Sequence, residues 1–537
     1  MTFALDRRGV LRLAGSALAA ASVLAAAPVA AAGLISAFAQ ALSAAVQGDE
    51  VLADFYRARS YATLWTGPDD AARRHSLFGA LETAGAHGLP VPRYDAAALR
   101  DMFAAAVTEG DLGRLEMQMS RAYLDFARDL SSGALEPATI DAGIKREIVR
   151  PDRGLLLVAA AQDGFDDYLA GLAPKAPEYS RLMKEKLALE AVIAAGGFGP
   201  KIAAEALGDG DSGAGVVQLR DRLMQLGYLA RSVTGSYDAA IAEAVQHFQL
   251  DHGLEADGKA AERTIGALNV EANQRLRAIV VAMERLRWMG NTPRGARHIW
   301  VNQPEFVARV IDGGAVTFRT RVVIGKVGKD TESPEFSDVM EFMVVNPTWS
   351  VPRSIVVKEY LPMLQKNANA QGQLQVIDRA GRVVARDAID FAAYNVHNFP
   401  FALRQPPSDG NALGKVKFMF PNANNIYLHD TPSKSLFAKE IRAFSHGCIR
   451  VASPFDMAYT LLAPQSEDPK ALFKSYLAGG REAVLNFVSP IPVHLVYFTA
   501  WPTEQGRIGY LADIYGRDAA LSEALVDAGV ALPLVQS

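Results

Sequence analysis

Apolar residues recur every three to four positions through the first part of the chain, which is the pattern of amphipathic helices. The clearest run predicts a helix that starts near Leu112 and ends at Ser131-Ser132-Gly133. Its apolar positions are Leu115, Met119, Tyr123, Phe126 and Leu130. The pattern predicts a helical region over residues 45–205, and we interpret its stripes as core packing.

Shorter apolar stripes predict a small three-helix module over residues 212–270, after the glycine-broken joint Asp209–Gly213. The first two stripes are Val216, Leu219, Leu223 and Leu226, then Ile241, Val245 and Phe248. A further stripe predicts a linker helix over residues 271–295.

From residue 296 the pattern becomes typical of strands. Ile299–Asp312 and Ala315–Ile324 are rich in β-branched and aromatic residues, and a Gly-Gly turn separates them. Met340–Val345 and Leu495–Thr499 predict two more strands. We therefore expect a mainly β domain over 296–505, followed by a C-terminal segment over 506–537. A helix-like and polar insertion at about 353–400 is either a lid over a site or a neutral surface elaboration.

Composition narrows the function classes. The 537 residues include 55 Lys+Arg and 59 Asp+Glu, for a net charge of −4, and 50% are hydrophobic. This composition excludes a wholly disordered chain, and the charge balance gives no electrostatic argument for a nucleic-acid partner. The single cysteine excludes a disulfide within the chain and any multi-cysteine metal site. We predict no cofactor and no metal.

The N-terminus carries features of an export signal. Arg7-Arg8 precedes an apolar, Ala-rich run over residues 13–27, and small residues continue through Ala32 to Ala37-Phe38-Ala39. Residues 1–39 resemble a twin-arginine signal peptide, which predicts an exported, periplasmic protein associated with the cell wall. The alternative is an N-terminal membrane anchor. The run is shorter than the roughly 20 apolar residues of a membrane span, so no stable span is expected.

One segment concentrates candidate chemistry, Ser445-His446-Gly447-Cys448-Ile449-Arg450. Gly447 lets the backbone turn tightly and approach a ligand. Ser453–Asp456 then opens a helix with a capping-box-like pattern. We expect Cys448 on a strand-to-helix turn, where a nearby helix N-terminus would favour the thiolate.

A cysteine nucleophile also needs a base, because a free thiol has a pKa of roughly 8.5. His429 ends the apolar strand Ile426–Leu428 and could face Cys448 from an adjacent strand. We assign proton transfer to His429, with the backbone carbonyl of Asp430 as its orienting acceptor. His446 is the competing candidate, and we interpret it as structural or substrate-positioning.

Two stretches resemble known families. The module over 212–270 resembles a peptidoglycan-binding domain in Leu226–Leu229, Tyr237-Asp238, Phe248-Gln249, Asp257-Gly258 and Leu268-Asn269. A histidine followed by Ser-His-Gly-Cys-Ile-Arg resembles the signature of the YkuD-type L,D-transpeptidase catalytic domain. Arg404–Pro407, Asn411–Phe418 and Asn346–Trp349 resemble its large Gram-negative members.

The resemblance implies a multidomain α+β fold: a helical N-terminal scaffold, the peptidoglycan-binding module, and a mainly β catalytic domain with an inserted lid. It places the nucleophile on Cys448 and the base on His429. Peptidoglycan stem peptides would be the partner, cross-linked between meso-diaminopimelate residues through a thioester with release of D-alanine.

Further site residues carry weaker expectations. The amides of Gly447 and Cys448 are the expected oxyanion donors, with Ser445 and His446 positioning the same loop. Arg450, where many smaller relatives have Asn, could hold a carboxylate or form a structural ion pair. Trp349 and Tyr427 are candidates for lining the cleft, with core packing as the alternative for both.

Other functions remain open from the sequence. A cysteine-dependent peptidoglycan hydrolase or amino-acid exchange enzyme would use the same nucleophile, although papain-like enzymes usually place Cys before His. His429, His446 and Cys448 could instead hold zinc, although His-x-Cys is an unusual metal spacing. A third alternative is a wall-binding scaffold with a silent catalytic domain.

Overall fold

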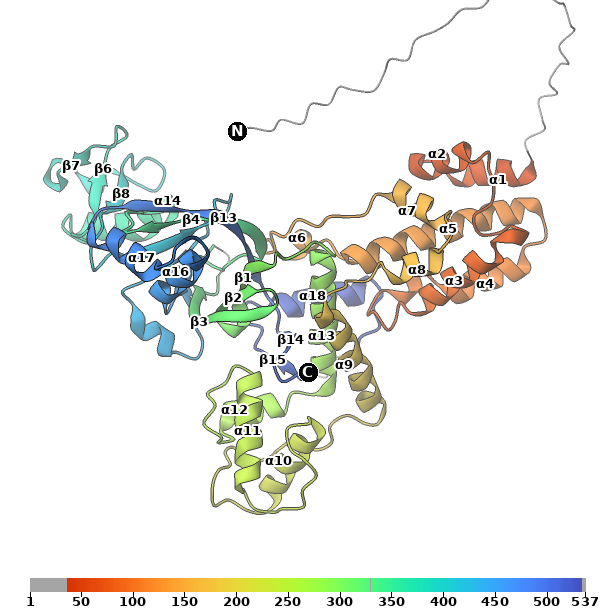
Figure 1. The fold of residues 1–537 in the computed structure, drawn as a ribbon, viewed down its shortest axis with the longest axis horizontal. Coiled ribbons are helices and arrows are strands. Elements are labelled where there is room, and N and C mark those ends of the chain that lie inside the picture. Colours follow the sequence, from red (N-terminus) through yellow and green to blue (C-terminus); the bar gives the residue numbers. More distant parts are fainter. Residues whose placement is uncertain (1–35, 329, 534–537) are drawn as a thin grey trace, which may run out of the picture.

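The computed structural model describes residues 36–328 and 330–533 (Figure 1). The first helix, α1 (Ala37–Ala45), takes in the last three residues of the predicted signal peptide, and Ala39 is buried against the helical region. The 1–39 boundary therefore overlaps the folded protein. The rest of that prediction, residues 1–35, lies outside the described residues. No helix within the described ranges is long and apolar enough to cross a membrane.

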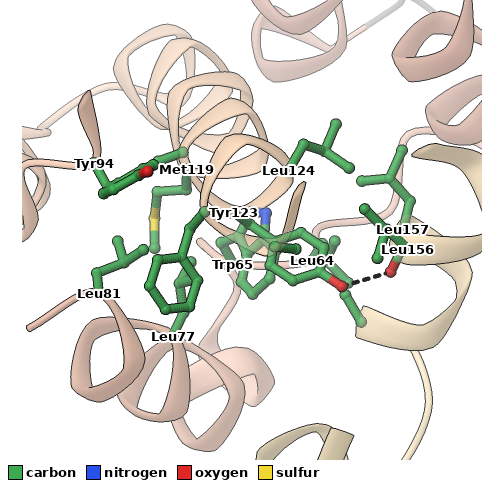
Figure 2. Packing of buried hydrophobic residues seen from close by; sticks show 14 of the residues in the cluster. Leu64, Trp65, Leu77, Leu81, Tyr94, Met119, Tyr123, Leu124, Leu156 and Leu157 are labelled. Carbon is green, nitrogen blue, oxygen red and sulfur yellow. Dashed lines mark hydrogen bonds between the residues drawn. The ribbon is translucent and has the colours of Figure 1, made fainter. Parts of the chain in front are cut away.

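The N-terminal region is helical, as predicted. Its long central helix α5 (Glu109–Ser132) ends at Gly133, where a positive φ of 91° suits glycine. Tyr123 packs beside Trp65 in the core and donates a hydrogen bond to the Leu156 carbonyl, 2.8 Å away (Figure 2). The other helices are α2 (Glu50–Ala58), α3 (Ala71–Glu82), α4 (Ala96–Ala105), α6 (Pro137–Ile140), α7 (Arg153–Ala160), α8 (Phe165–Ala170) and α9 (Pro177–Ala194).

The small module contains three helices, α10 (Ala214–Gln225), α11 (Ala239–Asp251) and α12 (Glu262–Leu268). Their apolar faces meet in one core around Leu219, Val245 and Phe248. These are the stripes on which the sequence prediction depends. The module lies at one side of the molecule, below the central helices in Figure 1.

The helix expected as a linker is also a buried part of the core. Helix α13 (Ala272–Met289) is buried along most of its length, because it packs against α9 on one side and α18 (Arg517–Asp527) on another. Its polar residues are buried too, in the pair Glu284–Arg287 and at Arg285. The apolar stripe in the sequence marked only one face of this helix. The other faces carry charged residues, which are usually exposed, so nothing in the sequence indicated that these faces are buried too.

The C-terminal half forms a nine-stranded sheet in the order β11-β3-β12-β10-β9-β4-β13-β1-β2, and a β2–β3 pairing closes it on itself. Its core includes Ile299, Phe418, Leu428 and Ile449, with α16 (Pro454–Leu462) and α17 (Pro469–Ala478) packed against it. Its strands are β1 (Arg297–Asn302), β2 (Val307–Asp312), β3 (Ala315–Gly325), β4 (Phe336–Val345), β9 (Val416–Met419), β10 (Leu428–His429), β11 (Ala443–Ser445), β12 (Ile449–Val451) and β13 (Ala483–Val496). The mixed α and β organisation confirms the predicted fold class.

The insertion between β4 and β9 is a subdomain with its own core. It holds α14 (Arg353–Ile355), a π-helical turn (Val356–Tyr360) and α15 (Leu361–Lys366). These pack on a four-stranded sheet of β5 (Trp349–Ser350), β6 (Gln375–Ile377), β7 (Val383–Val384) and β8 (Ala402–Gln405). We call this insertion, residues 349–405, the lid.

The C-terminal segment packs back onto the other units. It contributes the hairpin β14 (Ala500–Pro502) and β15 (Ile508–Tyr510), then α18. Arg517 of α18 is fully buried and donates to the Ser333 carbonyl at 3.1 Å. The segment Glu332–Glu335 therefore has the C-terminal helix against it.

Candidate active site

The candidate residues lie on one face of three neighbouring strands. Strand β10 runs parallel to β12, with His429 opposite Arg450, and antiparallel to β9, with His429 opposite Lys417. Because side chains alternate along a strand, Leu428 and Ile449 point into the core, while His429 and Arg450 point to the other face. Cys448 and Tyr427 precede those core residues directly and share this second face.

Cys448 lies on the turn between β11 and β12, ahead of a strand and not ahead of a helix. Helix α16 begins only at Pro454, and Ser453 makes no side-chain capping hydrogen bond. The expected strand-to-helix turn, its helix dipole and the capping box were therefore wrong. The sequence between Cys448 and Ser453 is short, but it contains the strand β12, which separates the sulfur from the helix.

His429 is held in one orientation by the backbone. The ring is buried, and its Nδ1 lies 2.5 Å from the Asp430 carbonyl oxygen. A carbonyl can only accept, so Nδ1 carries the proton in this hydrogen bond and Nε2 is left as the acceptor nitrogen. This contact is the one expected from the sequence. The Cys448 thiol itself donates to the Asn425 carbonyl oxygen at 3.6 Å.

Burial sets the charge state of both groups. It raises the pKa of the Cys448 thiol to about 11, against the opposing effects of hydrogen bonds from Tyr427 and the charge of Arg450. It also lowers the pKa of His429 to about 3, and the Arg450 charge adds to that effect. The resting site near neutral pH therefore holds a neutral thiol and a neutral imidazole.

One of the two expected oxyanion donors, the Gly447 amide, already forms a hydrogen bond within the loop before Cys448. The Gly447 amide donates to Ser445 Oγ at 3.2 Å, and Ser445 Oγ in turn donates to the Cys448 carbonyl at 2.5 Å. Ser445 therefore clamps the turn from inside. The Cys448 amide has no hydrogen-bond partner among the residues that the structure describes, so it alone of the pair stays available.

The ring of His446 contacts the lid. Its Nε2 lies 2.6 Å from Glu359 Oε1 on the π-helical turn. A second ion pair, between Lys358 and Asp330 at 2.8 Å, joins the lid to the segment after β3. His446 is thus exposed and engaged in a lid contact.

Two cations border the thiol. The side chain of Arg450 forms no hydrogen bond or ion pair within the described part of the chain, and its Nε atom is buried without a partner. The ion-pair alternative for Arg450 therefore has no support in this structure. Lys417 lies on the same face, 5.9 Å from the centre of the Tyr427 ring. Sequence reasoning missed Lys417, although its alternation with the buried Val416 and Phe418 could have placed it there.

The two aromatic candidates, Tyr427 and Trp349, lie in different parts of the structure. The Tyr427 ring lies 5.7 Å from the His429 ring and hydrogen-bonds to Cys448, so Tyr427 lines the site. Trp349 instead lies in the lid sheet and packs edge-on against Tyr360, with ring centres 6.4 Å apart. Its core-packing alternative is the one that the structure supports.

Among the described residues, neither a metal site nor the cavity beside the small module coincides with these side chains. Over residues 36–328 and 330–533, no group of three or more His, Cys, Asp or Glu side chains could hold a metal ion, so the zinc alternative lacks a ligand set. A cavity of about 610 Å³ lies where the small module meets α13 and the C-terminal segment. Its lining includes His252, Arg275 and Tyr510 but not Cys448.

Three family descriptions match the chain. A scaffold domain matches residues 50–185, a "Putative peptidoglycan binding domain" matches 212–268, and an L,D-transpeptidase catalytic domain matches 296–484. A Haemophilus influenzae protein named "Putative L,D-transpeptidase" is 33% identical over 248 residues, which are 45% of this chain and 48% of the relative. The match thus spans about half the length of that relative.

Solved structures give a weaker likeness. An L,D-transpeptidase from Xylanimonas cellulosilytica is 16% identical, with 55% of this chain and 98% of that chain covered and a TM-score of 0.16. One from Stackebrandtia nassauensis is 14% identical, with 55% and 96% covered and a TM-score of 0.23. These TM-scores establish no common fold, and the family assignment depends on the sequence matches. The chain thus contains a YkuD-type L,D-transpeptidase catalytic domain, together with a peptidoglycan-binding domain and a scaffold domain.

Proposed function

We propose that this protein is a peptidoglycan L,D-transpeptidase that joins two meso-diaminopimelate residues through a thioester on Cys448. The observation that supports the proposal is that β10, which carries His429, pairs with β12, and Cys448 lies on the turn directly before β12. The Asp430 carbonyl holds the His429 ring so that Nε2 can accept a proton. The family assignment supplies the reaction class, and these two residues supply a nucleophile and a base.

The first half-reaction forms the thioester. The sulfur attacks the carbonyl of the L-centre of diaminopimelate in a donor tetrapeptide stem, and its proton passes to His429 Nε2. The tetrahedral intermediate then collapses, the bond to D-alanine breaks, and the proton from His429 goes to the departing amine. Because the resting thiol is neutral, proton transfer and attack occur together in this scheme.

The second half-reaction uses an amine from another stem. That amine attacks the thioester carbonyl, gives up a proton through His429, and releases the Cys448 thiol. Water in place of the amine would make the protein a hydrolase, and a D-amino acid would make it an exchange enzyme. The two cations Arg450 and Lys417 are suited to hold the carboxylates of the stems beside the sulfur.

The other units fit the same substrate. We infer that the module over 212–270 binds peptidoglycan, and that the protein acts in the periplasm after export by the twin-arginine route. The domain boundaries of the sequence analysis belong to this proposal as well.

Disaccharide tetrapeptides and mass spectrometry test the proposal directly. The wild-type chain should release D-alanine and form a cross-linked dimer, while Cys448→Ala and Cys448→Ser should form none. Serine fails because its hydroxyl is far less acidic than a thiol and the neighbouring imidazole is a weak base. His429→Gln should lose activity by at least about 100-fold, within the range for general acid–base catalysis.

The matched control is His247→Gln, an exposed histidine on α11, which should leave product formation unchanged. Dimer formation by Cys448→Ala would refute the assignment. Tripeptide as the sole wild-type product would indicate a hydrolase, and retained wall binding without any product would indicate a scaffold.

A further inference from the structure

The Gly447 carbonyl is held by a serine far away in the sequence. Ser333 Oγ donates to the Gly447 carbonyl oxygen at 2.7 Å and accepts from the Gly325 amide at 2.9 Å. Ser333 is fully buried, so no water competes for these bonds. The peptide between Gly447 and Cys448 is therefore fixed from the side opposite to its amide.

This geometry determines the direction of the Cys448 amide. A trans peptide is planar, and its C=O and N–H bonds point in opposite directions. Anchoring the Gly447 oxygen on Ser333 thus aims the Cys448 N–H away from Ser333. The Gly447 amide is already engaged by Ser445, whereas the Cys448 amide has no partner within the described residues.

Ser333 is itself held by the C-terminal segment. Tyr515 donates its hydroxyl to the Gly325 carbonyl at 2.6 Å and accepts from the Ser333 amide at 3.3 Å. Arg517 donates to the Ser333 carbonyl. A methyl group on Gly325 would come within 2.0 Å of the Thr331 carbonyl oxygen, so the backbone before Ser333 lies directly on Gly325. Together these hydrogen bonds fix the position of both the backbone and the hydroxyl of Ser333.

We propose that Ser333 is a positioning residue that aims the Cys448 amide at the oxyanion of the tetrahedral intermediate, with Tyr515 fixing Ser333. This inference depends on the proposed function, since only an acyl-transfer reaction forms that oxyanion. It assigns a catalytic contribution to two residues outside the Ser-His-Gly-Cys segment, and Tyr515 lies beyond the matched catalytic domain of residues 296–484.

Two reactions of the same sulfur separate positioning from folding. Opening of a carbapenem such as meropenem passes through a tetrahedral oxyanion: the S–C bond forms, the lactam C–N bond breaks, and the thiol proton goes to the nitrogen. Alkylation by iodoacetamide forms an S–C bond and expels iodide, with no oxyanion. Because Cys448 is the only cysteine, intact-mass spectrometry measures both rates at one site.

Ser333→Ala should slow acylation by at least about tenfold, below the 100- to 1,000-fold loss of a whole oxyanion donor because the amide itself remains. Alkylation should stay within about twofold. Tyr515→Phe should show the same selective pattern with a smaller loss. The control is Ser337→Ala, whose hydroxyl contacts His494 on β13 at 2.8 Å and not the Cys448 loop, and both rates should stay unchanged.

Equal acylation rates in the wild type and Ser333→Ala would overturn the inference. Equal losses in both reactions would overturn it too, because Ser333 would then only keep the loop folded. If Ser333→Ala does not fold, Tyr515→Phe decides by the same two criteria. A wild-type chain that is alkylated but not acylated, and that forms no cross-link, would contradict the proposed function instead.

Discussion

Cys448 and His429 form an uncharged pair at rest, and burial is the reason. Removing the sulfur and the imidazole from water disfavours their charged forms, which moves the two pKa values in opposite directions. Arg450 and Lys417 favour a negative sulfur but disfavour a positive ring. The same two cations therefore favour the thiolate form of Cys448 and the neutral form of the His429 ring.

The charge state predicts a pH profile for alkylation of Cys448. With a thiol pKa of about 11, the thiolate fraction, and with it the iodoacetamide rate, should rise about tenfold per pH unit from pH 7 to 10. The sign follows because the reactive form is the deprotonated one and its pKa is raised. Intact-mass spectrometry at a series of pH values measures the rate at this single thiol.

Unfolding provides the control for that profile. In urea the thiol should return toward a pKa of roughly 8.5, so its rate should level off above about pH 9. A rate in the folded protein that is constant between pH 6 and 9 would instead indicate a thiolate–imidazolium pair, and would contradict the neutral resting state.

The sequence was sufficient to single out Cys448 and His429 as candidates and to predict the Asp430 carbonyl as the acceptor of the His429 hydrogen bond, because these depend on local chemistry and on one strand pairing. It was insufficient for Ser333, Glu359 and Lys417. Ser333 contacts Gly447 across 114 residues of chain, and Glu359 contacts His446 across 87. Such contacts depend on sheet closure and lid placement, which hydrophobic periodicity does not encode.

At the scale of elements, polar contacts join the lid to the turn that carries His446 and to the segment after β3. Its apolar residues pack among themselves, around Val356 and Leu403, and not onto the main sheet core. The contacts to the rest of the chain include His446–Glu359 and Lys358–Asp330. Exposed pairs of this kind are weak, so we expect them to restrain the lid only slightly.

Glu359→Ala should loosen the lid selectively. An exposed or half-exposed pair contributes up to about 1 kcal/mol, so amide exchange over residues 353–366 should speed up by as much as about fivefold, while the melting temperature stays nearly unchanged. Hydrogen-exchange mass spectrometry measures this by peptide. Glu341→Ala, at an exposed carboxylate on β4, should leave the exchange pattern as it is. Unaltered exchange in Glu359→Ala would mean that the pair does not restrain the lid.

Over the whole molecule, buried arginines join units that the sequence suggested were separate. Arg285 of α13 pairs with Asp518 of α18 and with Glu335 beside β4, at 3.2 Å for the latter. Glu335 also forms two backbone hydrogen bonds with the scaffold. Its amide donates to the Gly143 carbonyl, and its carbonyl accepts from the Lys145 amide, each at 2.8 Å. The scaffold, the central helix, the sheet and the C-terminal helix thus meet at one point.

Arg285→Met should be strongly destabilising for this reason. It leaves the buried carboxylate of Asp518 without its cation, and breaking a buried pair from one side typically costs roughly 3–5 kcal/mol. Urea unfolding followed by circular dichroism measures the change. Arg57→Met, at a pair with Asp54 in which both side chains are mostly exposed, should lower the free energy of unfolding by less than about 1 kcal/mol. Similar losses in both variants would contradict a shared buried anchor.

The anchoring of Glu332–Glu335 has a consequence for the history of the chain. The stretch matched by the catalytic family, residues 296–484, ends before Tyr515 and Arg517, and it begins after Arg285. Transplanting that stretch alone into another protein would move Cys448 and His429. It would leave behind Tyr515, which contacts Ser333, and Arg285, which pairs with Glu335. It would also leave behind the end of β13 that pairs with β1. The matched stretch of residues 296–484 is therefore smaller than the set of residues whose contacts hold the candidate site.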